Sequence, residues 1–303
     1  MLIDINEQRF LNNRIAALVN SSQGTYSETS CTQASTSSMS TPILFVHGYL
    51  DNANSFLPIL PFFKSYDCVA IDLAGHGRSS HRSADAHYHL SDYVYDLYCI
   101  VNESNWSTIT LVGHSLGGIV STMFAACFPE LVNRLILIES LGPLTEKENT
   151  SVSQLRDSMV SRVSANKPIK PPGSLKRLVE ARMKVSNMSE ANAELIMRRN
   201  TESLAHGLQW RTDKRLRTKS PMRLTENQAA DVLQNIQCPV HLVLGDKGFD
   251  KIKNMLSVRQ RLIQNFSYTT ESGGHHVHMD SPEQVAKSIL RFIETEQASD
   301  PSY

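Results

Sequence analysis

Five short apolar runs recur along the chain and predict buried β-strands. They span residues 43–46, 68–71, 109–112, 135–138 and 240–244. Each run is apolar at consecutive positions, so both faces of each strand are expected to be covered, as in a parallel sheet. Apolar residues recur at helical spacing in other segments, which span residues 90–102, 116–128 and 282–296. This alternation predicts an α/β fold with helices on both faces of the sheet.

Two segments depart from this pattern. Residues 21–41 hold thirteen Ser or Thr in twenty-one positions, which is too polar to bury. They predict a loop without catalytic residues between an N-terminal hairpin and the first buried strand. In residues 141–236 the strand pattern stops and helix-forming stretches take its place. We therefore expect a core made of residues 1–140 and 237–303, interrupted by a helical insertion.

Composition and charge narrow the function classes. Hydrophobic residues make up 41% of the chain, and thirty Lys and Arg balance thirty Asp and Glu. This balance argues against a dedicated nucleic-acid-binding protein. Residues 147–223 nevertheless contain seventeen basic and seven acidic residues, an excess of ten positive charges. We interpret this excess as a solvated surface, and attraction of an anionic substrate is the alternative.

The sequence predicts neither a membrane span nor a targeting signal. Glycines, serines and threonines interrupt the uncharged stretch at 104–129, and the N-terminus lacks the apolar core of a secretory signal. The five cysteines form no C-x-x-C pair and are expected to be reduced thiols. These features predict a cytoplasmic protein, and they leave its oligomeric state open.

The strongest candidate for chemistry is a serine between a strand and a helix. Gly113, Ser115 and Gly117 match the pattern G-x-S-x-G, with the apolar run at 109–112 before it and the predicted helix at 116–128 after it. In this nucleophile elbow, small neighbours allow a tight, strained turn that exposes the serine hydroxyl. Ser115 is therefore the predicted nucleophile, and an ordinary turn of small residues is the alternative.

A serine hydroxyl needs a base to act as a nucleophile. His275 follows a glycine after a predicted strand and just before the last predicted helix. It is the predicted general base, which takes the serine proton and returns it to the leaving group. His276 and His278 compete for this role, and the three histidines are also a candidate metal site, but no carboxylate or cysteine lies at ligand spacing. We predict no metal and no other cofactor.

Negative charge that develops in acyl transfer needs preorganised donors. The segment His47-Gly-Tyr-Leu50 follows the first buried strand, where one such donor belongs. The backbone N–H groups of Tyr49 and Leu116 are the predicted oxyanion hole. The His47 side chain is expected to have a structural role, as is the glycine-rich turn at 72–79, which lacks the spacing of a phosphate-binding loop.

Four segments together resemble one superfamily. In chain order they are HGYLDN, DLAGHGRS, GHSLGG and GGHHVHMDSP, and they are similar to the α/β-hydrolase superfamily over nearly the whole chain. HGYLDNANSF, GHHVHM and the stretch at 199–208 most resemble the serine hydrolase-like proteins within it. The resemblance implies the α/β-hydrolase fold, with a mostly parallel eight-stranded sheet, a helical cap at 141–236 and a Ser-His-acid site. In many relatives the substrate enters between cap and sheet.

The acid departs from the commoner family pattern. That pattern places it three residues after a glycine at the end of the penultimate strand, which corresponds to Gly248 here. Asp246 and Asp250 are offset from this position. Glu139 directly follows the strand predicted at 135–138, a place where some α/β-hydrolases carry the catalytic acid. We predict Glu139, with Asp246 as the alternative acid and a loop-bonding carboxylate as the structural interpretation of Glu139.

A serine at the elbow predicts acyl chemistry, because superfamily members that form alkyl-enzymes use an aspartate there. The predicted function is a serine hydrolase that attacks a carboxylic ester or thioester of a small molecule through an acyl-enzyme. A catalytically silent binding protein and an acyltransferase are the alternatives. Tyr49, Trp210 and Met183 are candidates for lining the pocket, although core packing is the preferred interpretation of each.

Overall fold

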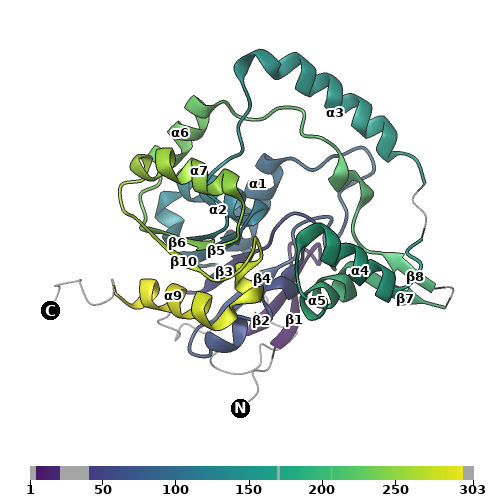
Figure 1. Cartoon of the computed structure of the whole chain (residues 1–303), viewed down its shortest axis with the longest axis horizontal. Coiled ribbons are helices and arrows are strands. Elements are labelled where there is room, and N and C mark those ends of the chain that lie inside the picture. The colour runs from purple at the N-terminus through teal and green to yellow at the C-terminus, as the bar shows by residue number, and fades with distance from the viewer. Residues whose placement is uncertain (1–4, 21–40, 169–170, 206, 296–303) are drawn as a thin grey trace.

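The computed structural model describes residues 5–20, 41–168, 171–205 and 207–295 (Figure 1). Its main feature is an eight-stranded sheet with the strand order β1-β2-β4-β3-β5-β6-β9-β10. The strands are β1 (Ile5–Phe10), β2 (Ile15–Asn20), β3 (Ile43–Val46), β4 (Cys68–Ile71), β5 (Ile109–His114), β6 (Val132–Ile138), β9 (Val240–Gly245) and β10 (Phe266–Glu271). β2 is antiparallel to β1 and β4, and all other neighbours are parallel. The predicted α/β-hydrolase fold, with its mostly parallel eight-stranded sheet, is confirmed.

All five strands predicted from the apolar runs are present. β3 and β4 have the predicted ends, and β5, β6 and β9 are longer than predicted. The predicted N-terminal hairpin is formed by β1 and β2. Of the predicted Ser/Thr-rich loop, residues 21–40 lie outside the described residues.

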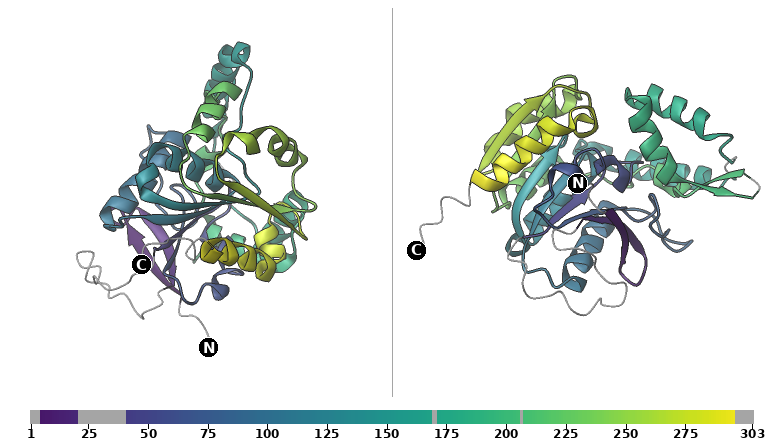
Figure 2. Two further views of the ribbon diagram at one scale, coloured as in Figure 1. Left: turned by 90° about the vertical axis from the view of Figure 1, so that its left-hand side faces the viewer. Right: turned by 90° about the horizontal axis from the view of Figure 1, so that it is seen from below.

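Alternate residues of the central strands belong to two separate apolar clusters. In β3, Leu44 and Val46 belong to the cluster that α1 (Leu90–Glu103) and α2 (Leu116–Cys127) cover, whereas Ile43 and Phe45 belong to the cluster that α9 (Pro282–Thr295) covers. Residues of α6 (Glu226–Gln234) and α7 (Asp250–Arg259) also belong to the first cluster. Both faces of the sheet are therefore buried, as the consecutive apolar positions predict (Figure 2).

Residues 141–236, here called the insertion, lie between β6 and β9. They contain α3 (Ser151–Ala165), α4 (Leu175–Ser186), α5 (Glu190–Asn200) and α6. They also contain the strands β7 (Thr201–Leu204) and β8 (Gly207–Trp210), an antiparallel pair that the hydrophobic pattern does not predict. Residues of α4 and α5 form a third apolar cluster with Met279 of α8 (Val277–Asp280). The insertion is thus attached to the C-terminal part of the core through apolar contacts.

α3 projects beyond the rest of the molecule (Figures 1 and 2). Five of its apolar side chains are exposed: Val152, Leu155, Met159, Val160 and Val163. Its contacts with the rest of the insertion are largely polar. Gln154 accepts a hydrogen bond from the Arg223 N–H at 2.8 Å, and Ser161 accepts one from the Lys219 N–H at 2.9 Å. The buried residue of α3 is Ser158.

Two further predictions concern membrane-spanning helices and the state of the cysteines. Every helix within the described ranges is too short or too polar to cross a membrane. Cys68 and Cys238 are buried, Cys99 is half-buried and Cys127 is exposed, and all four are free thiols. Cys31 lies outside the described residues.

Candidate active site

Ser115 occupies a tight turn between β5 and α2. Its backbone has φ 50° and ψ −113°, a conformation that non-glycine residues rarely adopt. The turn brings α2 against β3 so closely that a Cβ atom at Gly117 would lie 2.0 Å from the carbonyl oxygen of Val46. Only glycine fits at this position, so the spacing recognised in the sequence has a direct steric cause.

The His275 imidazole lies between Ser115 and a carboxylate. Its Nε2 is 2.9 Å from the Ser115 hydroxyl oxygen, and its Nδ1 is 3.3 Å from Oε2 of Glu139. Because the carboxylate accepts a hydrogen bond from the Nδ1–H group, Nε2 is left as the acceptor for the hydroxyl proton. The Phe249 ring stacks on the imidazole with a centroid distance of 3.9 Å. Burial lowers the pKa of His275, although the hydrogen bond to Glu139 acts in the opposite direction.

Glu139 begins the loop that follows β6. Its carboxylate accepts hydrogen bonds from two N–H groups. One belongs to Gly245, the last residue of β9, at 2.8 Å, and the other to Phe249, in the segment after β9, at 3.1 Å. Its side chain is buried, and its own backbone has φ 49°. Two amides and one imidazole therefore hold this carboxylate in a single orientation.

The other acidic candidates face elsewhere. Asp246 is exposed, and its carboxylate accepts a hydrogen bond from the Gly273 N–H at 2.8 Å, which joins the loops after β9 and β10. Asp250 is exposed in the first turn of α7. The structure thus brings Glu139, the first candidate, to His275 and leaves Asp246 in a loop-bonding position.

The two amides predicted for the oxyanion hole lie at the ends of neighbouring strands. Leu116 is the first residue of α2, where backbone N–H groups have no partner within the helix. Tyr49 follows β3, which pairs with β5, and its hydroxyl donates a hydrogen bond to the carbonyl of Leu216 in the insertion at 3.1 Å. The Leu116 amide therefore lies in the turn that carries Ser115, and Tyr49 lies in the loop after the neighbouring strand.

His47 has the structural role that its position suggested. Its Nε2 accepts a hydrogen bond from the Leu73 N–H at 2.9 Å, and its Nδ1 donates to the Gly48 carbonyl at 2.7 Å. Burial lowers the pKa of His47 to about 4, so the ring is neutral at pH 7. It ties the loop after β3 to the loop after β4.

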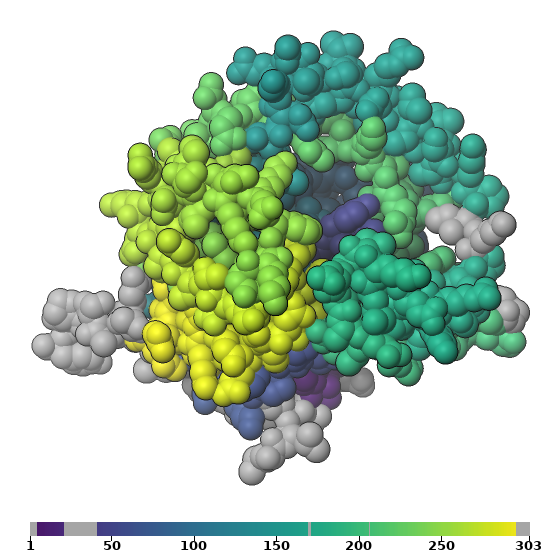
Figure 3. Space-filling view, viewed as in Figure 1, coloured from purple at the N-terminus to yellow at the C-terminus, as the bar shows by residue number. Residues whose placement is uncertain are grey.

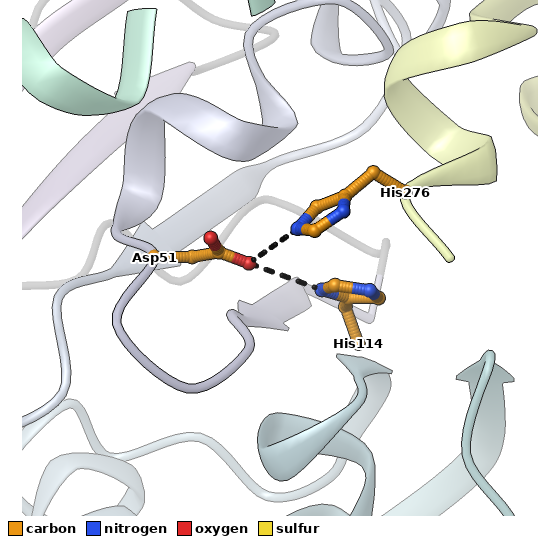
Figure 4. A group of neighbouring side chains, drawn as sticks. All are labelled: Asp51, His114 and His276. Atoms are coloured by element: carbon orange, nitrogen blue, oxygen red, sulfur yellow. Dashed lines mark hydrogen bonds and ion pairs between the residues drawn. The ribbon is translucent and has the colours of Figure 1, made fainter. Parts of the chain in front are cut away.

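Among the described residues, neither His276 nor His278 has a hydrogen bond to Ser115. His276 Nε2 lies 3.1 Å from Oδ2 of Asp51, and the same oxygen lies 3.5 Å from Nδ1 of His114 (Figure 4). The guanidinium of Arg182, from α4, pairs with the other oxygen of Asp51. His278 is fully buried, and burial lowers its pKa well below the ordinary value.

The Asp51 cluster was not predicted. The proximity of Asp51 and His114 could have been predicted, because Asp51 follows β3 and His114 ends β5, and these two strands are neighbours. The partner Arg182 is 131 residues away in the chain, and its contact depends on how α4 packs. Only the three-dimensional arrangement shows it.

Of the three candidates for lining a pocket, two pack within the insertion. Met183 and Trp210 are half-buried against the apolar cluster of α4 and α5, which agrees with the preferred packing interpretation. Tyr49 is 47% exposed, so the packing interpretation is wrong for this residue. The space-filling view shows a hollow between α7, α3 and the part of the insertion that holds α4 and α5 (Figure 3).

Comparisons with known proteins identify the family of the chain. The sequence model of a family described as the alpha/beta hydrolase fold matches residues 41–282. Human serine hydrolase-like protein 2 is 33% identical over 274 residues, which cover 84% of this chain and 87% of that protein.

Solved structures show the same similarity in three dimensions. A hypothetical protein from Pseudomonas aeruginosa PAO1 has a TM-score of 0.82 at 32% identity, covering 96% of this chain and 99% of that chain. The thioesterase domain from the curacin biosynthetic pathway has a TM-score of 0.76 at 25% identity, covering 96% of this chain and 100% of that chain. The chain belongs to the α/β-hydrolase family and is similar to proteins named serine hydrolase-like.

Proposed function

We propose that this protein is a serine hydrolase that cleaves a carboxylic ester or thioester of a small molecule through an acyl-enzyme. The observation that carries the proposal is the continuous chain of contacts from the Ser115 hydroxyl through the His275 imidazole to the Glu139 carboxylate. A nucleophile, a base within hydrogen-bond distance and a group that orients the base are the parts that acyl transfer needs.

In the first half of the reaction, Ser115 Oγ attacks the carbonyl carbon of the substrate while His275 Nε2 takes the hydroxyl proton. The imidazolium that forms is stabilised by the Glu139 carboxylate at Nδ1. The proton then passes to the leaving alcohol or thiol, and the acyl group stays on Ser115. In the second half His275 activates a water molecule, which releases the acid and restores the serine.

The backbone N–H groups of Tyr49 and Leu116 are the proposed donors to the oxyanion of both tetrahedral intermediates. Donors fixed by a strand end and a helix start need no reorganisation when the charge develops. Removal of a single such donor typically lowers kcat about 10²–10³-fold.

We infer that the insertion acts as the cap of this site. Its residues border the hollow in Figure 3, and Leu216 accepts the hydrogen bond from Tyr49 beside the proposed oxyanion hole. The preference for esters and thioesters draws support from the similar thioesterase domain and from a similar protein named putative esterase/lipase.

Labelling with a fluorophosphonate tests the proposal without knowledge of the substrate. We expect one adduct per chain by intact-mass measurement, located on Ser115 by peptide mapping and absent in Ser115→Ala. Folded protein that gives no adduct would contradict the proposal and favour a catalytically silent binding protein. Product analysis with and without an added alcohol then separates hydrolysis from acyl transfer.

A further inference from the structure

Asp51 is a buried carboxylate to which the proposed mechanism gives no task. It is 1% exposed, and its Oδ2 faces His276 Nε2 at 3.1 Å and His114 Nδ1 at 3.5 Å (Figure 4). Oδ1 pairs with Arg182. A carboxylate that is fully removed from water is costly unless such partners compensate it. Burial alone would raise the pKa of Asp51, but His276 and Arg182 hold it well below its usual range.

The partners of Asp51 are the chain neighbours of the two proposed reacting residues. His114 directly precedes Ser115, and His276 directly follows His275. A third contact closes the arrangement, because Nε2 of His114 donates a hydrogen bond to the backbone carbonyl of His275 at 2.9 Å. The His114 imidazole therefore joins the segment that carries the nucleophile to the segment that carries the base, and the Asp51 carboxylate holds the second segment through His276.

The hydrogen-bond pattern shows what this arrangement needs from Asp51. A carbonyl oxygen only accepts, so His114 Nε2 carries a proton and, in the neutral ring, Nδ1 is unprotonated. Nδ1 of His114 has no hydrogen-bond partner among the described residues. His276 Nε2 is then the imidazole donor to Asp51, and Arg182 is the fixed positive charge beside it.

We propose that Asp51 is a positioning residue for the hydrolase reaction: its carboxylate fixes His276 and, with it, the segment that carries His275, while Arg182 of α4 balances its charge. This inference rests on the proposed function. It also makes the relative positions of Ser115 and His275 depend on how α4 of the insertion packs.

A second pair in the molecule provides a matched control. Asp72, which follows β4, is also fully buried and also pairs with an arginine of the insertion, Arg199, at 2.8 Å. Its other partners are the N–H groups of Ala53 and Arg78, which lie outside the segments of Ser115 and His275. Asp51 and Asp72 therefore share burial and charge pairing and differ in what they hold.

The test compares Asp51→Asn with Asp72→Asn in the full chain. For each variant, the rate of fluorophosphonate labelling, kcat and KM on an ester that the wild type cleaves, and Tm are measured. We expect both variants to lower Tm, because each removes a buried negative charge that pairs with an arginine of the insertion. Only Asp51→Asn should lower labelling and kcat, by about 10–100-fold, since misplacement by about 1 Å costs on the order of 10²-fold, while KM stays within about threefold of wild type.

A pH profile supplies a readout that a loss of packing would not move. The titratable groups around His275 are Glu139 after β6, His114 at the end of β5, Asp51 after β3, and His276 and His278 on its own segment. The Asp51 charge raises the pKa of His275. Asp51→Asn should therefore move the acidic limb of kcat/KM to lower pH, and Asp72→Asn should leave it in place.

His276 offers a second route if Asp51→Asn does not fold. We expect His276→Ala to lower kcat, and His276→Gln, whose amide can still donate to Asp51, to retain more of it.

Equal kcat and equal pH profiles for the Asp51 and Asp72 variants, or no difference between His276→Ala and His276→Gln, would overturn the positioning role while the proposed function stands. A wild type that is not labelled would overturn the proposed function instead. NMR titration of the His275 imidazole would still test the influence of Asp51, and an unchanged pKa in Asp51→Asn would count against it.

Discussion

Glu139 and Asp246 are two carboxylates just beyond the ends of the adjacent strands β6 and β9, and their environments differ sharply. Glu139 is 1% exposed and accepts hydrogen bonds from two amides and one imidazole. Asp246 is exposed and accepts one from the Gly273 amide. A Cβ atom at Gly248 would lie 2.1 Å from Oε1 of Glu139. The comparison teaches that the commoner acid position is a glycine here because the carboxylate from the neighbouring strand already fills that space.

The largest expected effect separates the two carboxylates directly. Glu139→Gln removes the charge that stabilises the imidazolium, and we expect kcat to fall by about 10²–10⁴-fold. Asp246→Asn should change kcat by less than about threefold, because its carboxylate bonds only a loop. Both are measured on the same ester at the same pH. The opposite ranking would assign the acid to Asp246.

A double variant tests whether the two strand ends are interchangeable. Gly248 has an ordinary negative φ, so an aspartate is sterically allowed there once the Glu139 carboxylate is gone. We expect Glu139→Ala/Gly248→Asp to recover at least about tenfold of the kcat lost in Glu139→Ala, since a carboxylate would again be available to orient the imidazole. The kcat of the double variant is compared with that of Glu139→Ala, and Gly248→Asp alone is the control for the effect of the new side chain. If the double variant is no better than Glu139→Ala, the space around Gly248 does not direct a carboxylate to His275.

The space at Gly248 can also be tested through stability. Gly248→Ala places a methyl group against the Glu139 carboxylate, and we expect a loss of about 1–3 kcal/mol in the free energy of unfolding from overpacking. Urea denaturation measures it. Gly173→Ala is the matched control, because the nearest atom to a Cβ there is 3.8 Å away. Equal effects in the two variants would show that the close approach at Gly248 relaxes without cost.

The smallest expected effect is a shift in pH dependence. His275 must be neutral to accept the serine proton, so kcat/KM rises with pH through the pKa of this group. Because burial lowers the pKa of His275, the acidic limb should lie below the ordinary value of about 6.5. Glu139→Gln should move the limb further down, since the Glu139 carboxylate raises that pKa. A limb above 6.5 in the wild type would contradict this account.

The apolar runs predicted the central strands because those strands are buried on both faces, and the glycine spacing of the elbow has a steric cause that the sequence displays. Glu139 was predicted because it directly follows a predicted strand, at a place where some α/β-hydrolases carry the catalytic acid. The hairpin β7–β8 was missed, since its residues are mostly half-buried or exposed and show no apolar run. Asp51 was missed because its charge partner lies in the insertion, and no local pattern in the sequence relates positions that far apart.

The sparse packing of α3 has a consequence for local stability. A helix whose exposed apolar side chains gain little from burial, and which is tied down largely by polar contacts, opens at a free energy well below that of global unfolding. Its amide hydrogens should exchange with solvent long before those of α2, whose apolar residues are buried against the sheet. Thermal motion at the border of the hollow would then be concentrated in α3, while the turn at Ser115 stays rigid.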